Sequence, residues 1–78
     1  MADELAIRLR LARTEAGLSR ELLAGMIGVS FATLVRYETG RTQRTSLETL
    51  AKIAEATDKP LVWFFETDEL RRRNLATK

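Results

Sequence analysis

Residues 20–39, with the sequence RELLAGMIGVSFATLVRYET, carry two short helical patterns that meet at a glycine. Leu23 and Ile27 are four residues apart, so both lie on one face of a first helix. Gly28 follows where a helix commonly ends in the left-handed conformation, which glycine adopts at little cost. Ser30 can begin a second helix, because its hydroxyl can accept a backbone N–H of the first turn. The stretch therefore predicts two short helices joined by a tight turn.

The second helix has an inner edge formed by Leu34 and Tyr37, which are three residues apart, and Gly40 can end it. Ala24 stands where the two helices must cross, and a small side chain there permits their close approach. Two short helices joined by a short turn that contains glycine form a helix-turn-helix motif. We therefore predict this motif, with its second helix over residues 31–38.

The motif and its flanks resemble the Cro/lambda-repressor-like family, also called the xenobiotic-response-element type. Within the motif, the residues that match the family pattern are Leu23, Ala24, Ile27, Gly28, Val29, Leu34 and Tyr37. Outside it, the matching residues are Arg13, Gly17-Leu18-Ser19, Glu38-Thr39-Gly40 and Ser46-Leu47-Glu48-Thr49-Leu50. The resemblance covers roughly residues 5–65, and it implies a compact all-α domain of five helices that binds DNA.

The residue content argues against catalytic chemistry. The 78-residue chain has no cysteine and no histidine, so it lacks the side chains that most often act as activated nucleophiles, bases and zinc ligands. Each of the three serines precedes a predicted helix, where capping explains it. Gly25 and Gly28 have no strand before them, as a phosphate-binding loop requires. We therefore predict that the protein is not an enzyme, and we expect no cofactor, metal or small-molecule site.

The charge of the chain is unevenly distributed. The net charge of +2 is small, but residues 20–44 carry four arginines against two glutamates. Residues 45–70 carry two lysines against six acidic side chains, and residues 71–78 carry four positive charges. Positive charge therefore lies beside the helix-turn-helix, with an acidic segment after it. This polarity suits the docking of a polyanion on one face.

The segment before the motif predicts a helix over residues 3–16. Its buried stripe is formed by Leu5, Leu9, Ala12 and Ala16. Ile7 and Leu11 lie on the opposite side of this helix. We expect them to cover the aromatic segment near the C-terminus, and the alternative is an exposed patch for self-association.

The segment after the motif predicts two more helices. Ser46 caps the first, which ends near residues 57–58. Its expected inner residues are Leu47, Leu50, Ala51, Ile53 and Ala54. Pro60 suits the start of a second helix over residues 61–65. The sequence LVWFF is also compatible with a strand, but no second strand is present to pair with it. We expect this segment to close the core over the first helix.

The outward face of the 31–38 helix is the predicted DNA-contacting surface. In the family, the positions that contact base edges correspond to Ser30, Phe31, Ala32, Val35 and Arg36. An arginine can bind guanine through two hydrogen bonds, although Arg36 could instead contact a phosphate or only solvent. The three apolar residues depart from the polar residues usual in the family. They can contact the methyl group of thymine, which favours A·T pairs, or they can form a protein-binding patch.

A second group of residues is predicted to contact DNA phosphates. It consists of Arg20, Thr33, Arg41, Thr42, Gln43 and Arg44, and the alternative for the arginines is an ordinary solvated charge. The family commonly has glutamine in place of Arg20, where it binds a phosphate and braces the recognition helix. An arginine can reach the phosphate, but its bracing role is left open. Arg13 and Glu38 match a structural ion pair of the family, which we expect to be partly exposed and to contribute about 1 kcal/mol.

The resemblance implies a sequence-specific regulator of transcription, most often a repressor of phage or bacterial type. Such a protein places one helix in the major groove of a double-stranded operator, and a homodimer is expected on a two-fold-related site. The alternative is a protein-interaction module, such as an antitoxin or regulatory partner, that uses the apolar face of the same helix. The acidic start of the chain does not resemble a signal peptide, so we expect a cytoplasmic, nucleoid-associated protein.

The boundary of the DNA-binding domain is predicted near residue 66. Residues 1–66 form the domain, and residues 67–78 form a polar, basic tail or a short extra helix. Three arginines at 71–73 could touch DNA, remain in solvent, or begin a linker to a further domain.

Overall fold

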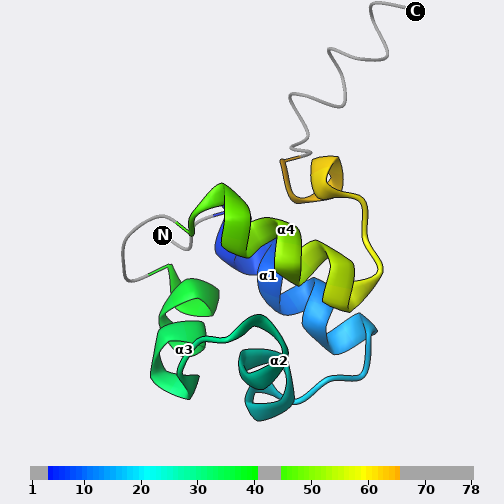
Figure 1. Ribbon diagram of the computed structural model, residues 1–78. Helices are drawn as coiled ribbons and strands as arrows, with labels where there is room; N and C mark the ends of the chain where they lie inside the picture. The colour runs from blue at the N-terminus through cyan, green and yellow to red at the C-terminus, as the bar shows by residue number, and fades with distance from the viewer. Residues whose placement is uncertain (1–3, 41–44, 66–78) are drawn as a thin grey trace, which may run out of the picture.

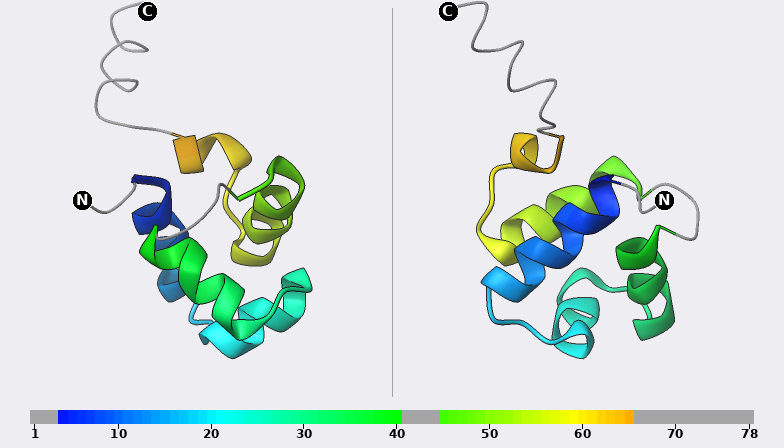
Figure 2. Two further views of the ribbon diagram at one scale, coloured as in Figure 1. Left: turned by 90° about the vertical axis from the view of Figure 1, so that its left-hand side faces the viewer. Right: turned by 180° about the vertical axis from the view of Figure 1, so that it is seen from behind.

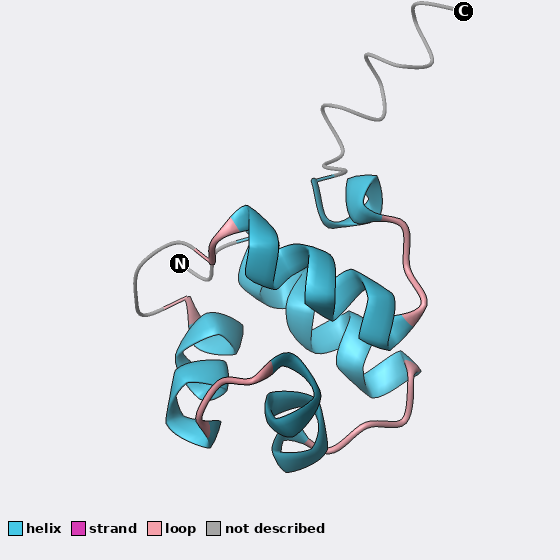
Figure 3. Cartoon of the chain, viewed as in Figure 1, coloured by secondary structure: helices cyan, strands magenta, loops and turns pink. Residues whose placement is uncertain are grey.

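The computed structural model describes residues 4–40 and 45–65. The described part contains the helices α1 (Glu4–Glu15), α2 (Arg20–Ile27), α3 (Phe31–Thr39) and α4 (Leu47–Thr57), followed by the 3₁₀ helix η1 (Leu61–Phe65). Figure 3 shows helices and loops and no strand in this part of the chain. The predicted all-α class is confirmed, and the fifth helix is a short 3₁₀ helix rather than an α-helix.

The helices form two groups on either side of a central pair. Figure 1 shows α1 and α4 side by side, with α2 and α3 on one side of them and η1 on the other. The two further views in Figure 2 preserve this arrangement. α1 packs against α3, α4 and η1, whereas α2 packs against α3 and α4. The helix-turn-helix formed by α2 and α3 therefore rests on the α1–α4 pair, opposite η1.

The helix ends are set by residues that the sequence identifies. The hydroxyls of Ser19, Ser30 and Ser46 accept the backbone N–H groups of Leu22, Thr33 and Thr49, which caps α2, α3 and α4. At the other ends, Gly28, Gly40 and Asp58 adopt the left-handed conformation, with φ of 77°, 68° and 58°. The observed helix ends agree with the predicted ones within one residue. Serine N-caps and left-handed C-caps both depend on residues close in the sequence, so they can be predicted from it.

The core contains side chains from every described helix. Its largest fully buried side chains are Leu9, Leu23, Leu34, Leu50, Ile53 and Phe64. Phe64 is the aromatic residue through which η1 closes the core. Burial of a side chain of this size contributes about 1.5–3 kcal/mol to stability relative to its exposure. The prediction that residues 61–65 close the core is confirmed, and the strand alternative is wrong.

Part of the predicted stripe of α1 is wrong. Ala16 lies in the turn after the helix and is exposed. Ala6, near the start of α1, is buried although it was not among the predicted stripe residues. Ile7 and Leu11 do not cover η1, since they are 48% and 43% exposed. Contacts between α1 and η1 include Arg8, whose Nη1 donates to the backbone oxygen of Trp63 at 2.9 Å, and the core cluster that contains Leu9 and Phe64. The side of α1 that bears Ile7 and Leu11 is left open by the helices in the described part of the chain.

Two of the predicted inner residues of α4 are also exposed. Leu47 is 65% exposed and Ala51 faces solvent. Leu50, Ile53 and Ala54 are buried, as expected, and Thr57 joins them. Leu47 and Ala51 lie at the edge of this stripe on the helical wheel, beyond the width that α1 and α2 cover. The apolar pattern therefore located the right stripe but made it too wide.

Candidate nucleic-acid interface

The turn between α2 and α3 is closed by backbone hydrogen bonds. The N–H groups of Gly28 and Val29 both donate to the backbone oxygen of Ala24, at 2.9 and 3.0 Å. Ala24 is only 4% exposed, and Leu23 and Ile27 are buried beside it. The small side chain at Ala24 lets the chain turn back on α2, so that α3 packs across it. This local geometry fixes where α3 begins.

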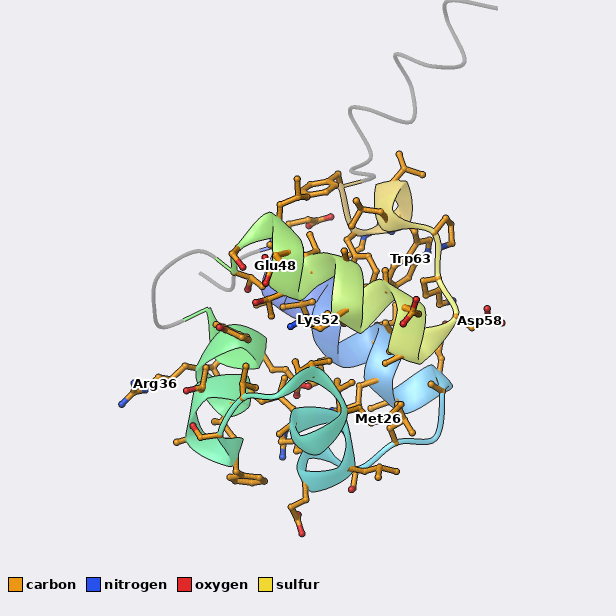
Figure 4. The ribbon with its side chains drawn as sticks, viewed as in Figure 1. Met26, Arg36, Glu48, Lys52, Asp58 and Trp63 are labelled. Atoms are coloured by element: carbon orange, nitrogen blue, oxygen red, sulfur yellow. The ribbon has the colours of Figure 1, made fainter. Side chains whose placement is uncertain are left out.

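The predicted base-contacting residues line the outward side of α3. Phe31 is 47% exposed, Ala32 and Arg36 face solvent, and Val35 is half-buried. Figure 4 shows the side chain of Arg36 extending from α3 away from the rest of the molecule. Ser30 stands at the tip of the helix as its N-cap. The structure thus brings together the five predicted residues on one exposed surface, which we call the α3 face (residues 30, 31, 32, 35 and 36).

The C-terminal end of α3 carries a buried carboxylate. Glu38 is 5% exposed and accepts two hydrogen bonds from Arg13, with Nε at 2.7 Å and Nη2 at 3.2 Å. Arg20 adds a third bond, from its Nε to Glu38 Oε1 at 3.1 Å. Arg13 also donates to the backbone oxygen of Leu18 at 2.9 Å. We call Arg13, Arg20 and Glu38 the ion cluster; it joins α1, α2 and α3.

The ion cluster differs in two ways from the expectation. The Arg13–Glu38 pair is buried rather than partly exposed, so loss of one partner leaves an uncompensated buried charge and costs more than the expected 1 kcal/mol. Arg20 does brace α3, through its Nε, although this role was left open. Its side chain is still 39% exposed, which leaves its outer end accessible. The sequence missed this bond because residues 18 positions apart meet only in the fold.

The remaining predicted phosphate-contacting residues are divided between two regions. Thr33 lies in the first turn of α3 and is half-buried, with its hydroxyl bound to that of Ser30 at 2.8 Å. Arg41, Thr42, Gln43 and Arg44 lie outside the described residues, as does the predicted tail. In the sequence, residues 41–44 come after α3, which carries the α3 face, and before α4.

Other kinds of site find little support in the described residues. Their His, Cys, Asp and Glu side chains form no group of three that could hold a metal ion. None of their helices has the length and apolar character needed to cross a membrane. A solvent-open depression lies between the ends of α1 and α4, where Lys59 pairs with Glu15 at 2.7 Å. It is formed by elements other than α2 and α3, so it is separate from the α3 face.

Comparison with known proteins agrees with this geometry. A family model described as helix-turn-helix matches residues 9–64. The crystal structure of the restriction-modification controller protein C.AhdI from Aeromonas hydrophila superposes with a TM-score of 0.73 and 34% sequence identity, covering 80% of this chain and 92% of that one. Fold and comparison together define the class as helix-turn-helix proteins. The chain belongs to the helix-turn-helix family of the Cro/C1 type.

Two curated relatives are also transcriptional regulators by name. An uncharacterized HTH-type transcriptional regulator of Sinorhizobium medicae (strain WSM419) is 37% identical over 59 residues, which cover 76% of this chain and 42% of that protein. An uncharacterized transcriptional regulator in the ATPase CF(0) region of Rhodospirillum rubrum is 45% identical over 58 residues, covering 74% and 53%. The chain thus matches about half the length of these relatives.

Proposed function

We propose that this chain binds double-stranded DNA by inserting α3 into the major groove, and that it represses transcription by occupying an operator. One observation carries the proposal: the ion cluster fixes the inner side of α3 while Arg36 projects from its outer side. A recognition helix must be held rigidly, because contacts to base edges depend on its position in the groove. This activity requires no catalysis.

The proposed contacts fall into two sets. Ser30, Phe31, Ala32, Val35 and Arg36 face the base edges, and Arg36 makes the paired hydrogen bonds to guanine. Arg20, Thr33 and the loop residues Arg41, Thr42, Gln43 and Arg44 contact phosphates. Arg20 serves both functions, since its Nε is bound to Glu38 and its outer nitrogens remain for a phosphate.

We further propose that the chain acts as a homodimer in the bacterial or phage-infected cytoplasm. One α3 covers only a few base pairs, so two copies on a two-fold-related operator supply the affinity and the half-site spacing that repression needs. Residues 1–66 form the DNA-binding unit in this proposal, and residues 67–78 form a tail or a short extra helix.

The first test is a titration by fluorescence anisotropy of a random-sequence duplex at several salt concentrations. We expect affinity to fall steeply with the logarithm of the salt concentration, because phosphate contacts release counterions. The double substitution Arg41→Ala with Arg44→Ala should weaken binding equally for all sequences and reduce the salt slope by about 1.8.

The matched control removes a positive charge elsewhere. Lys52→Ala changes an exposed side chain on α4 and should leave the salt slope unchanged. Absence of binding even at low salt would overturn the proposal and favour a protein partner for the exposed Phe31 surface. An unchanged slope in the double variant would show that residues 41–44 do not contact phosphates.

A further inference from the structure

Two hydroxyl groups on α3 and its cap, those of Ser30 and Thr39, have their protons engaged locally, whereas Thr33 Oγ1 accepts the Ser30 proton. Ser30 Oγ donates to Thr33 Oγ1 at 2.8 Å and accepts the Thr33 backbone N–H at 3.1 Å. Thr39 Oγ1 donates back to the backbone oxygen of Val35 at 2.9 Å. Neither hydroxyl has a proton left for a base edge in this arrangement. The α3 face therefore offers DNA the apolar surfaces of Phe31, Ala32 and Val35 and the guanidinium of Arg36.

We propose that the α3 face recognises the C5-methyl group of a pyrimidine beside a guanine, and that thymine and 5-methylcytosine can both supply this methyl group. The inference rests on the proposed DNA binding and specifies its ligand. Phe31 is 47% exposed at the start of α3, so a large apolar surface would enter the groove first. In the major groove, the thymine methyl is the apolar group that distinguishes one standard base pair from another.

Apolar side chains detect this methyl group without detecting the atom next to it. Thymine presents an oxygen acceptor at C4, whereas 5-methylcytosine presents an amino donor at the equivalent position. A side chain with no donor or acceptor, such as Phe31 or Val35, makes no hydrogen bond that could separate them. Uracil and cytosine lack the methyl group and therefore lose the contact. The affinity of the chain for a duplex should therefore depend on whether the pyrimidine carries the methyl group, and not on whether that pyrimidine is thymine or cytosine.

Arg36 places a guanine contact next to the methyl contact. It follows Val35 directly in the chain and lies four residues after Ala32, so it shares the exposed side of α3 with both. Arginine binds O6 and N7 of guanine through two hydrogen bonds. The steps TG and 5-methyl-CG present the same arrangement of a methyl group followed by these two acceptors. Methylation of a CG step would then convert a poor site into one that resembles TG.

The test begins with duplexes selected by the intact chain from a random-sequence pool. In the selected half-site, each thymine is replaced in turn by uracil, by cytosine paired with guanine, and by 5-methylcytosine paired with guanine. Competition anisotropy then measures the affinity of each duplex. Each contacted methyl should change affinity about fourfold, the factor that corresponds to burial of one methyl-sized group. Uracil should bind more weakly than thymine, and 5-methylcytosine more tightly than cytosine.

Two variants connect the methyl effect to the α3 face. Phe31→Ala should abolish the difference between thymine and uracil at one position, while thermal unfolding checks that the fold is retained. Val62→Ala is the matched control, because Val62 is 61% exposed on η1, on the opposite side of the α1–α4 pair. The control should keep the full difference between thymine and uracil.

The outcomes separate this inference from the proposed function. Loss with uracil and gain with 5-methylcytosine supports both methyl sources, and loss with uracil alone supports thymine as the source. Selected duplexes that bind equally with thymine and uracil overturn the inference but leave DNA binding in place. Failure to enrich or bind any duplex overturns the proposed function itself.

Discussion

The two ends of α3 invert the usual distribution of polar and apolar residues. The last turn buries the carboxylate of Glu38, and the first turn exposes the aromatic ring of Phe31. Elsewhere in the described core, buried residues are almost all apolar. In the last turn, hydrogen bonds from two arginines compensate the cost of burying a charge. In the first turn, about half of the Phe31 side chain remains exposed.

This contrast shows that the polarity of a side chain does not by itself decide its burial within one helix. Glu38 is buried because its bonds join three helices, and it helps to position α3. Phe31 is about half exposed, so its truncation should cost the core little. We therefore expect substitution of Glu38 to lower stability, and substitutions on the α3 face to lower the proposed DNA recognition.

The largest effect is expected from Glu38→Ala. Its removal leaves the charge of Arg13 buried without an anionic partner, and we expect a loss of about 3–5 kcal/mol in the free energy of unfolding. Urea denaturation followed by circular dichroism measures this change. Glu48→Ala is the matched control, because this exposed glutamate lies 4.0 Å from Lys52 and should change stability by less than about 0.5 kcal/mol. Equal stability of the two variants would show that the ion cluster does not hold α3.

A smaller effect, confined to recognition, is expected from Arg36→Ala. The exposed side chain contributes little to folding, so the free energy of unfolding should stay within about 0.5 kcal/mol of the parent value. Preference for guanine at one base pair should fall by about 1–3 kcal/mol. Affinities for a selected duplex and its single-base variants measure this preference. If binding to all the duplexes weakened equally, Arg36 would be a phosphate contact instead.

A modest effect on both stability and DNA binding is expected from Arg20→Ala. Its bond to Glu38 is partly exposed and Arg13 still pairs with the carboxylate, so stability should fall by at most about 1 kcal/mol. Loss of its outer nitrogens should also lower the salt slope of DNA binding by about 0.9. Arg20→Lys retains the charge and should preserve that slope. A slope in Arg20→Ala equal to the parent value would limit Arg20 to its bracing role.

The elements that the sequence located best are those with local causes. Serine caps, left-handed glycines and the i, i+4 spacing of Leu23 and Ile27 act within a few residues, so the bounds of α2 and α3 could be derived directly. The exposed α3 face followed from the same periodicity, since Leu34 fixes which side is buried. Contacts of this face with DNA remain predictions.

The errors concern residues whose burial depends on neighbouring helices. Ile7 and Leu47 have apolar side chains at suitable spacings, but no described helix packs over them. Periodicity gives the direction of a buried stripe and not its width, because the width depends on how many neighbours surround the helix. The 3₁₀ geometry of residues 61–65 also depends on packing, since the same residues are compatible with an α-helix or a strand.

The sequence by itself therefore determined the helix-turn-helix, its caps and the residues that face outward from α3. The tertiary structure decided the ion cluster and the open sides of α1 and α4. Arg20 and Glu38 are 18 residues apart, and no local rule relates them until α2 and α3 cross. Short-range hydrogen bonds and periodicity are encoded in neighbouring residues, whereas burial and charge pairing between helices arise only when the chain is packed.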